Sequence, residues 1–309
     1  MISENSVTLK SKGILMKYFQ ILLFVIVLSS CKSEENQFNI DEEYTAEIDN
    51  FFNAKMEERQ GDYLQLVALH KLDSGDNTIG KNISNDLSLN IESLPETIGT
   101  VKLENDSLSF IATKNVSIKT ENDSVITSLP LPLNQYGSSI KLYHNQLSWQ
   151  IITRSNEHYL RVWDANNVAI QTFNGFQHFE LNRNLIFDAD FIYYKEEITE
   201  IVKAKVDGKR STNFIGNITF AYNNDTYSLA VGSDGFTMVG DLTTGETTYG
   251  GGRYMYIQLP KENGKVVLDF NTLYNPPCAF SEFTTCLYPP RQNQLPFAIK
   301  AGEKITLKL

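Results

Sequence analysis

Residues 241–303 put many turn-forming, aromatic and polar residues into a short space. The stretch reads DLTTG at 241–245, TYGGGR at 248–253, DFNTLYNPPC at 269–278, CLYPP at 286–290 and NQLP at 293–296. Glycine, proline, asparagine and aspartate in close succession predict tight turns between short extended segments. We therefore expect β structure here, with a candidate site among its loops, where binding residues are most often found.

A period of two in the apolar residues extends back from this stretch to residue 62. Short apolar runs end in Gly, Asn or Asp and recur about every eight to twelve residues, which indicates a β-sandwich or barrel. The sequence predicts a mainly β fold with two packed antiparallel halves, residues 62–165 and 166–309. Two hairpin turns are predicted, one at Asn223–Asp225 and one at Asn263–Gly264.

In residues 41–61 the apolar residues are spaced as in a helix rather than as in a strand. Apolar residues recur three and four positions apart, and the charged residues occupy the other side. The apolar set is Tyr44, Ile48, Phe51, Phe52 and Met56, and the charged set is Glu42, Glu43, Glu47, Glu57, Glu58 and Arg59. We predict one N-terminal amphipathic helix whose apolar stripe packs on the sheets.

Residues 1–30 have the pattern of a lipoprotein signal peptide. Lys17 precedes an uncharged apolar run at 18–28, and Leu28-Ser29-Ser30-Cys31 resembles a bacterial lipobox. The resemblance implies that Cys31 carries a lipid and that 31–40 form a tether. Lys32-Ser33-Glu34-Glu35 resembles the acidic tether of some Bacteroidetes surface lipoproteins. We expect a lipid anchor at the outer membrane or cell surface, with a periplasm-facing position as the alternative.

The charge of the chain limits its partners. The 309 residues carry a net charge of −10, without a basic cluster in the sequence. Binding of nucleic acid needs a basic surface, so that class of partner is excluded. The remaining partners are the membrane, through the lipid, and a small polar ligand or an envelope protein.

The motifs of residues 241–303 resemble the domain-of-unknown-function 1684 family of bacterial proteins, from about Gly61 onward. That family has no established activity, so the resemblance implies relatives and not a reaction. This chain departs from the family pattern at Thr272 and Gln294, where basic residues are usual, which predicts weaker anion binding in this stretch. Matching positions include Asp241, Thr243, Gly245, Thr248, Tyr249, Gly252, Arg253, Asp269, Asn271, Tyr274, Cys278, Cys286, Pro290, Asn293 and Glu303.

The first half carries a second resemblance. Gly75-x-x-x-Ile79-Gly80-Lys81 followed by Asn85-Asp86-Leu87 is similar to the opening of forkhead-associated domains. That family has an arginine in the place of Lys81 and reads phosphothreonine with a Ser-x-x-His motif. The corresponding segment here, 94–99, has neither residue. The resemblance implies a shared sandwich without the phosphopeptide site.

Asp269 and Asn271 flank Phe270 and therefore point to the same side of an extended segment. A buried carboxylate needs a partner, and Arg253 is the candidate. Two interpretations stay open: a buried polar network that fixes the proline-rich segment, or a pocket for a polar ligand. The candidate binding residues are Asp241, Thr243, Tyr249, Arg253, Asp269, Asn271, Tyr274 and Asn293.

Cys278 and Cys286 form either a disulfide or a pair of free, reactive thiols. Without further Cys or His nearby they do not form a metal site, and we expect no cofactor. Motifs for a nucleophile with its base are absent from the sequence. The first hypothesis is thus a binding or structural module. The alternative is a hydrolase-like enzyme that uses Asp269 or Cys278 with Arg253 or Tyr249.

Overall fold

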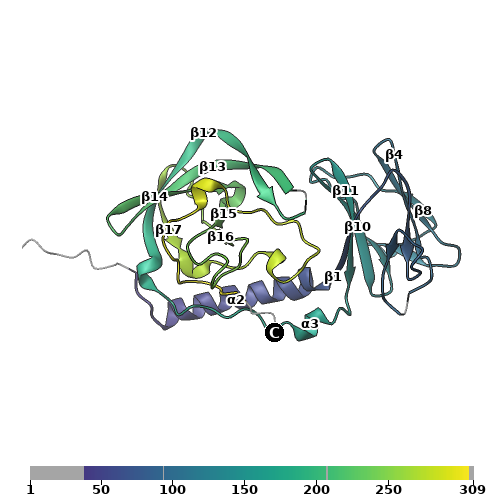
Figure 1. Ribbon diagram of the computed structural model, residues 1–309, viewed down its shortest axis with the longest axis horizontal. Helices are drawn as coiled ribbons and strands as arrows, with labels where there is room; N and C mark the ends of the chain where they lie inside the picture. The colour runs from purple at the N-terminus through teal and green to yellow at the C-terminus, as the bar shows by residue number, and fades with distance from the viewer. Residues whose placement is uncertain (1–37, 93, 207, 306–309) are drawn as a thin grey trace, which may run out of the picture. The chain divides into compact units, whose positions relative to one another are not determined.

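The N-terminal strands form two sheets that pack face to face. The computed structural model describes residues 38–92, 94–206 and 208–305 (Figure 1). One sheet has the strand order β1-β11-β10-β9-β6-β7 and the other β3-β2-β4-β5-β8. Neighbouring strands are antiparallel except β2 and β3, which are parallel. The bounds are β1 Leu66–Lys71, β2 Gly75–Gly80, β3 Leu87–Ser88, β4 Gly99–Glu104, β5 Ser107–Ala112, β6 Ile118–Thr120, β7 Val125–Ile126, β8 Ser128–Pro130, β9 Leu142–His144, β10 Leu147–Arg154 and β11 Glu157–Asp164.

Alternating residues of these strands fill the space between the two sheets. Phe110 on β5 and Trp149 on β10 are buried there, with ring centroids 5.5 Å apart. Leu142, Leu160 and Val162 belong to the same core. The apolar residues that recur at every second position in the sequence are therefore the ones that face inward on each strand.

The C-terminal strands form a four-stranded sheet, β14-β13-β12-β17, and a two-stranded sheet, β15-β16. Phe220 and Phe270 lie in their shared core, with ring centroids 5.6 Å apart, and Leu268 is fully buried beside them. The bounds are β12 Ile186–Ala204, β13 Gly208–Tyr222, β14 Asp225–Gly232, β15 Phe236–Val239, β16 Arg253–Tyr256 and β17 Gly264–Asp269. Most of residues 270–303 follow as loops and short turns, which Figure 1 draws in yellow.

One predicted hairpin turn is confirmed and the other is wrong. Asn223 and Asn224 have φ of 51° and 67° and join β13 to β14, as a tight hairpin turn requires. β17, which begins at Gly264, pairs with β12 and not with the preceding strand β16. The carboxamide oxygen of Asn263 accepts a hydrogen bond from the Tyr193 backbone N–H on β12, at 2.8 Å. That contact draws the segment to the edge of the larger sheet.

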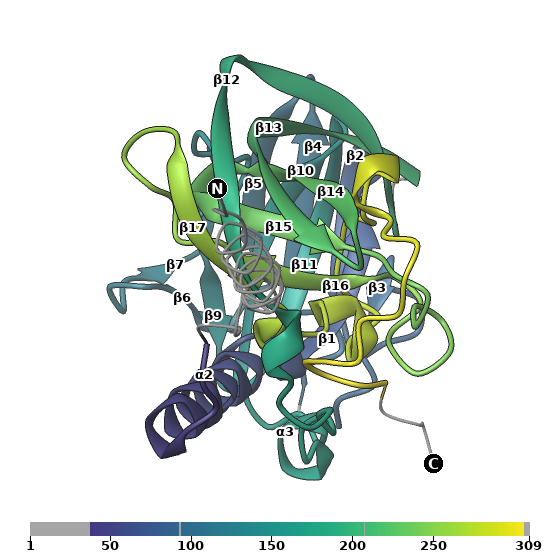
Figure 2. The same ribbon diagram turned by 90° about the vertical axis from the view of Figure 1, so that its left-hand side faces the viewer.

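Helix α2, Glu42–Gly61, is the predicted N-terminal helix (Figures 1 and 2). Asp41 caps it by accepting a hydrogen bond from the Tyr44 N–H, and the first turn is acidic, which suits the helix dipole. Ile48 and Phe52 pack in a core with Phe214 on β13. The placement of Arg59 on the solvent side is wrong, because that side chain is buried.

The remaining helical segments are short. They are α3 Ala169–Thr172 and the single turns η2 Tyr63–Gln65, η3 Arg183–Leu185, η4 Ser233–Gly235, η5 Phe270–Thr272, η6 Pro277–Ala279 and η7 Arg291–Asn293. None of the helices in the described ranges is long and apolar enough to cross a membrane. The fold class, mainly β with one long N-terminal helix, is confirmed. The signal peptide and Cys31 lie outside the described residues.

Candidate functional site

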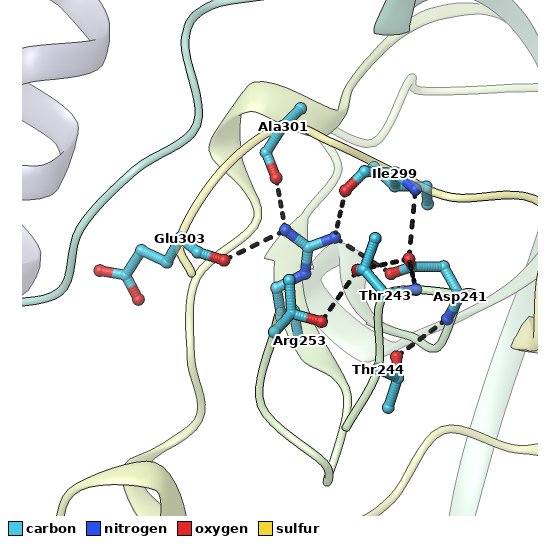
Figure 3. A network of polar contacts seen from close by, with 8 residues as sticks. Asp241, Thr243, Thr244, Arg253, Ile299, Ala301 and Glu303 are labelled. Carbon is cyan, nitrogen blue, oxygen red and sulfur yellow. Dashed lines mark hydrogen bonds and ion pairs between the residues drawn. The ribbon is translucent and has the colours of Figure 1, made fainter. Parts of the chain in front are cut away.

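Arg253, at the start of β16, lies in a closed polar network (Figure 3). Its guanidinium donates to Oδ2 of Asp241 at 3.0 Å, to the Ile299 carbonyl at 2.9 Å, and to the carbonyls of Ala301 and Glu303. Only 1% of the Arg253 surface is exposed. Both terminal nitrogens of the guanidinium thus bond to backbone carbonyls or to a carboxylate of the chain. The network therefore fixes the C-terminal segment.

The other oxygen of Asp241 completes this network. Oδ1 accepts from the Thr243 N–H and hydroxyl at 2.7 Å and 2.6 Å and from the Ile299 N–H at 3.1 Å. The Thr243 hydroxyl lies 2.9 Å from that of Thr248. Figure 3 shows the carbonyl of Glu303 facing Arg253, while its carboxylate points away. For Asp241, Thr243 and Arg253, the geometry supports the interpretation as a buried polar network.

The expected pair of Arg253 and Asp269 does not form. Oδ2 of Asp269 accepts from the hydroxyl of Tyr44 on helix α2 at 2.7 Å, and Oδ1 accepts from the N–H and Nδ2 of Asn271, both at 2.9 Å. Burial raises the pKa of Asp269, against these three donors, which lower it. The pair with Arg253 does not form because Asp269 caps the turn η5 and its carboxylate faces helix α2 rather than β16.

Asn293 and Tyr249 also have structural partners. The carboxamide of Asn293, which is fully buried, bonds the N–H of Ala230 at 2.7 Å and the carbonyls of Ala230 and Met238 at 2.9 Å and 2.8 Å. It thus joins the η7 turn to β14 and β15. The hydroxyl of Tyr249 donates to the Cys278 carbonyl at 3.0 Å.

A second buried ion pair was missed from the sequence. Arg59 of helix α2 donates to both carboxylate oxygens of Glu303, at 2.8 Å and 2.9 Å. The Asn275 N–H donates to the same carboxylate at 2.6 Å, and His178 Nε2 lies 3.8 Å away. Burial raises the pKa of Glu303, but His178 and Arg59 outweigh it, so the pKa lies below its ordinary value. A lone arginine on a charged helix face gave no signal of this contact.

Cys278 and Cys286 lie at disulfide distance, with Cα atoms 6.0 Å apart. The loop between them is one wall of a cavity of about 310 Å³, to which it contributes Phe280, Thr284 and Thr285. Helix α2, turn η2, strands β10, β11, β13, β15 and β16, and the segment after Leu273 supply the rest. The other lining residues are Lys55, Glu58, Arg59, Tyr63, Arg154, Arg161, Arg210, Phe236, Tyr254, Tyr256, Tyr274, Asn275, Pro277, Cys286 and Leu287.

Five of these lining side chains are cationic and one, Glu58, is anionic. Lys55 is bonded to Glu58 at 2.7 Å, and Arg59 to Glu303. Two of the other three cations bond to Thr285 of the loop. Arg154 Nε donates to the Thr285 hydroxyl at 3.3 Å, and Arg210 Nη1 donates to the Thr285 carbonyl at 3.1 Å.

Arg161 is the third of these cations. Its Nε is buried and has no hydrogen-bond partner among the described residues. Burial and the neighbouring charges of Arg154 and Arg210 lower its pKa to about 10, although Asp62 and Tyr63 raise it. Arg161 is thus charged at neutral pH in a place that disfavours its charge. A group in such surroundings, lining a cavity, is a functional-site candidate on physical grounds.

Tyrosine rings supply much of the remaining lining. Tyr254 is buried and donates its hydroxyl to the Leu287 carbonyl at 2.6 Å. Tyr274 is buried beneath Lys55, whose Nζ lies 4.5 Å from the ring centroid. Tyr256 is 54% exposed. The cavity therefore combines guanidinium groups with aromatic faces.

Of the eight candidate binding residues, Tyr274 alone lines this cavity. The other seven belong to the contacts described above. Asp241, Thr243 and Arg253 lie in one polar network, Asp269 bonds to Asn271, and Asn293 and Tyr249 each bond to backbone groups. The cations of the cavity come from outside residues 241–303, so the basic positions replaced by Thr272 and Gln294 do not bear on them. No group of three or more His, Cys, Asp or Glu side chains suited to a metal ion occurs in residues 38–92, 94–206 and 208–305.

Comparisons with known proteins give relatives without an activity. No curated protein matches the chain. The solution NMR structure of an uncharacterised protein of Haloarcula marismortui is similar, with 25% identity and a TM-score of 0.38, over 45% of this chain and 80% of that one. The crystal structure of Rv1747 FHA-1 of Mycobacterium tuberculosis matches with 6% identity and a TM-score of 0.21, over 33% of this chain and 97% of that one.

The resemblance to a family was predicted to begin at about Gly61, but the match with the family model begins at residue 171. It leaves out the sandwich and covers the segment that contains strands β12 to β17 and the Arg253 network. Residues 171–304 match the model of the family described as Protein of unknown function (DUF1684), the family that the motifs of residues 241–303 resemble.

Proposed function

We propose that the protein is a non-catalytic binding module for a small anionic ligand, held at the cell envelope by a lipid on Cys31. The observation that carries the binding function is Arg161. A charged guanidinium with a buried, unpartnered Nε lines the cavity. The charges of Arg154 and Arg210 act on it there.

Three neighbouring guanidinium groups repel one another, and burial removes part of the water that would solvate them. A bound anion offsets both effects, because it supplies opposite charge and accepts hydrogen bonds. Arginine is well suited to this task, since its planar fork bonds phosphate or carboxylate with two parallel donors. At about 310 Å³ the cavity lies at the small end of the range for ligand pockets, which favours a small molecule.

The alternative, a hydrolase-like enzyme, gains little from the geometry. Asp269 is bonded to Tyr44 and Asn271, and Arg253 to Asp241. Cys278 lies at disulfide distance from Cys286, so it does not offer a free thiol for nucleophilic attack. A nucleophile and base within reach of each other are the geometric requirement of such a reaction. The proposed residues do not meet it.

Calorimetric titration with inorganic phosphate, sulfate and citrate at low ionic strength tests the binding function. We expect the wild-type protein to bind at least one of these anions. Arg161→Gln removes the guanidinium group and its charge and should weaken binding about tenfold or more, the range expected for a charge-assisted hydrogen bond. Arg291→Gln, which changes an exposed arginine outside the cavity, is the matched control and should bind like the wild type.

The proposal fails if no anion binds to the wild-type protein. It fails equally if Arg161→Gln and Arg291→Gln bind anions with the same affinity, because the sites would then lie elsewhere on the surface. Circular dichroism and thermal unfolding of each variant show that a loss of binding is not a loss of fold.

A further inference from the structure

We infer that the ligand carries a ring next to its anionic group and that Tyr256 is the side chain that packs on the face of this ring. The class of ligand is a ring-bearing phosphate or carboxylate, such as an aromatic phosphate monoester or a phosphorylated sugar. The inference rests on the anion-binding function proposed above and goes beyond it, because inorganic anions have no ring.

The lining of the cavity separates by element into two kinds of surface. The guanidinium groups of Arg154, Arg161 and Arg210 come from β10, β11 and β13. The rings of Phe236 and Tyr256 come from the small sheet of β15 and β16, where the two residues are directly paired. An anion alone would need only the first surface. A ring attached to the anion makes use of the second.

Tyr256 differs from the neighbouring rings in its exposure. Tyr254 and Tyr274 are 6% and 8% exposed, whereas Tyr256 is 54% exposed. The Phe236 ring packs against it at a centroid distance of 5.5 Å with an interplanar angle of 52°, which is a tilted contact and not a stacked one. An aromatic side chain at a cavity with over half of its surface free has room for another ring.

One cation, Lys55, lies beside Tyr256, and it is paired with Glu58. The Lys55 Nζ lies 6.0 Å from the centroid of this ring, at the outer limit of a cation–π contact. A ring on Tyr256 therefore lies near Lys55, in the cavity that the three arginines also line. The small volume restricts the ligand to about one ring and its anionic group rather than an extended polymer.

The test is a titration with three probes: inorganic phosphate, phenyl phosphate and glucose 6-phosphate. We expect the wild-type protein to bind at least one of the two ring compounds about tenfold more tightly than inorganic phosphate, the preference that one aromatic stacking contact provides. A preference for phenyl phosphate identifies an aromatic ring, and a preference for glucose 6-phosphate identifies a sugar ring.

Variants assign this preference to one side chain. Tyr256→Ala should bring the affinities of the three probes together, whereas Tyr256→Phe keeps the ring and should keep the preference. Tyr136→Ala is the matched control, since Tyr136 is 76% exposed and lies away from the lining residues.

Two results would overturn the inference and leave the proposed function standing. One is equal affinity of the wild-type protein for all three probes, with binding that depends on Arg161. The other is a ring preference that persists in Tyr256→Ala. Absence of binding for every probe would overturn the proposed function itself.

Discussion

Two arginines of this protein, Arg253 and Arg161, differ in whether the chain supplies partners that match their charge. Arg253 meets Asp241 and three backbone carbonyls, so its charge is matched within the chain. Arg161 lines a cavity, and the charges nearest to it include those of Arg154 and Arg210. A matched buried arginine serves the fold. An arginine whose charge is disfavoured by its neighbours is retained at a cost in stability, which is a common property of binding sites.

At this scale we predict that Arg161→Gln stabilises the free protein while it weakens anion binding. The neutral amide avoids the burial of charge, and the expected gain is about 1 kcal/mol in the free energy of unfolding at pH 7. Chemical denaturation of the wild type and of Arg161→Gln measures this gain, with Arg291→Gln as the control that should change little.

The predicted gain depends on pH. Arg161 has a folded-state pKa of about 10, below its ordinary value, so the folded state disfavours its proton. The penalty is present in full below about pH 10 and falls as the pH rises through 10, so the stability difference between wild type and Arg161→Gln should narrow there. A variant that is less stable than the wild type at pH 7 would contradict the prediction.

Among the elements, the loop between Cys278 and Cys286 has the clearest double role. Its ends are held at disulfide distance, and Phe280, Thr284 and Thr285 from within it line the cavity. Thr285 also receives hydrogen bonds from Arg154 and Arg210. The loop therefore positions two of the three arginines as well as enclosing the space in front of them.

We predict that replacing both cysteines by serine lowers the free energy of unfolding by about 2–3 kcal/mol, the entropy that a short closed loop removes from the unfolded chain. Phosphate affinity should fall as well, because the loop that carries Thr285 loses its closure. Denaturation and phosphate titration of the double variant measure the two effects, and dithiothreitol on the wild-type protein should reproduce both.

Mass spectrometry provides the control for this prediction. Trypsin releases both cysteines in one peptide, residues 266–291, which contains no internal Lys or Arg. The disulfide form of that peptide is lighter by two hydrogens than the dithiol form. If protein purified without reductant gives the dithiol form of this peptide, the disulfide is contradicted and the two cysteines are free thiols.

For the molecule as a whole, the elements followed from local sequence and the site did not. The helix at 42–61 and the turn at Asn223–Asn224 depend on residues a few positions apart, so spacing and turn chemistry predicted them. Arg161 looked like any charged residue on a strand. Its proposed role depends on a cavity that it shares with Arg210 of β13 and with residues after Leu273, and no local pattern encodes that arrangement.

The errors in the sequence predictions have the same origin. Arg253 and Asp269 were paired because a buried carboxylate needs a partner, which is correct. The partner is Tyr44, 225 positions away in the sequence. Gly264 follows a good turn residue, but Asn263 bonds to Tyr193 on β12 instead of closing a hairpin. In each case the contact that forms joins distant parts of the sequence, and the contact predicted from the sequence does not form.

The proposed attachment to the membrane concerns the whole molecule, and we predict that it depends on the thiol of Cys31. Cys31→Ser removes the group that receives the lipid, so the protein should move from the membrane fraction to the soluble fraction after cell fractionation. The net charge of −10 leaves no electrostatic attraction to anionic headgroups that would replace the acyl chains. Ser33→Ala is the control and should remain with the membrane. Retention of Cys31→Ser in the membrane fraction would contradict the anchor.

The pair of Arg59 and Glu303 has a consequence for the order of events during synthesis. The two residues are 244 positions apart, so the helix leaves the ribosome long before its counter-charge has been made. Until then Arg59 has to stay in water, because a lone guanidinium is costly to bury. Nascent chains that stop short of Glu303 thus lack the ion pair that holds helix α2 in place, so the contact can form only after the segment through Glu303 has been translated.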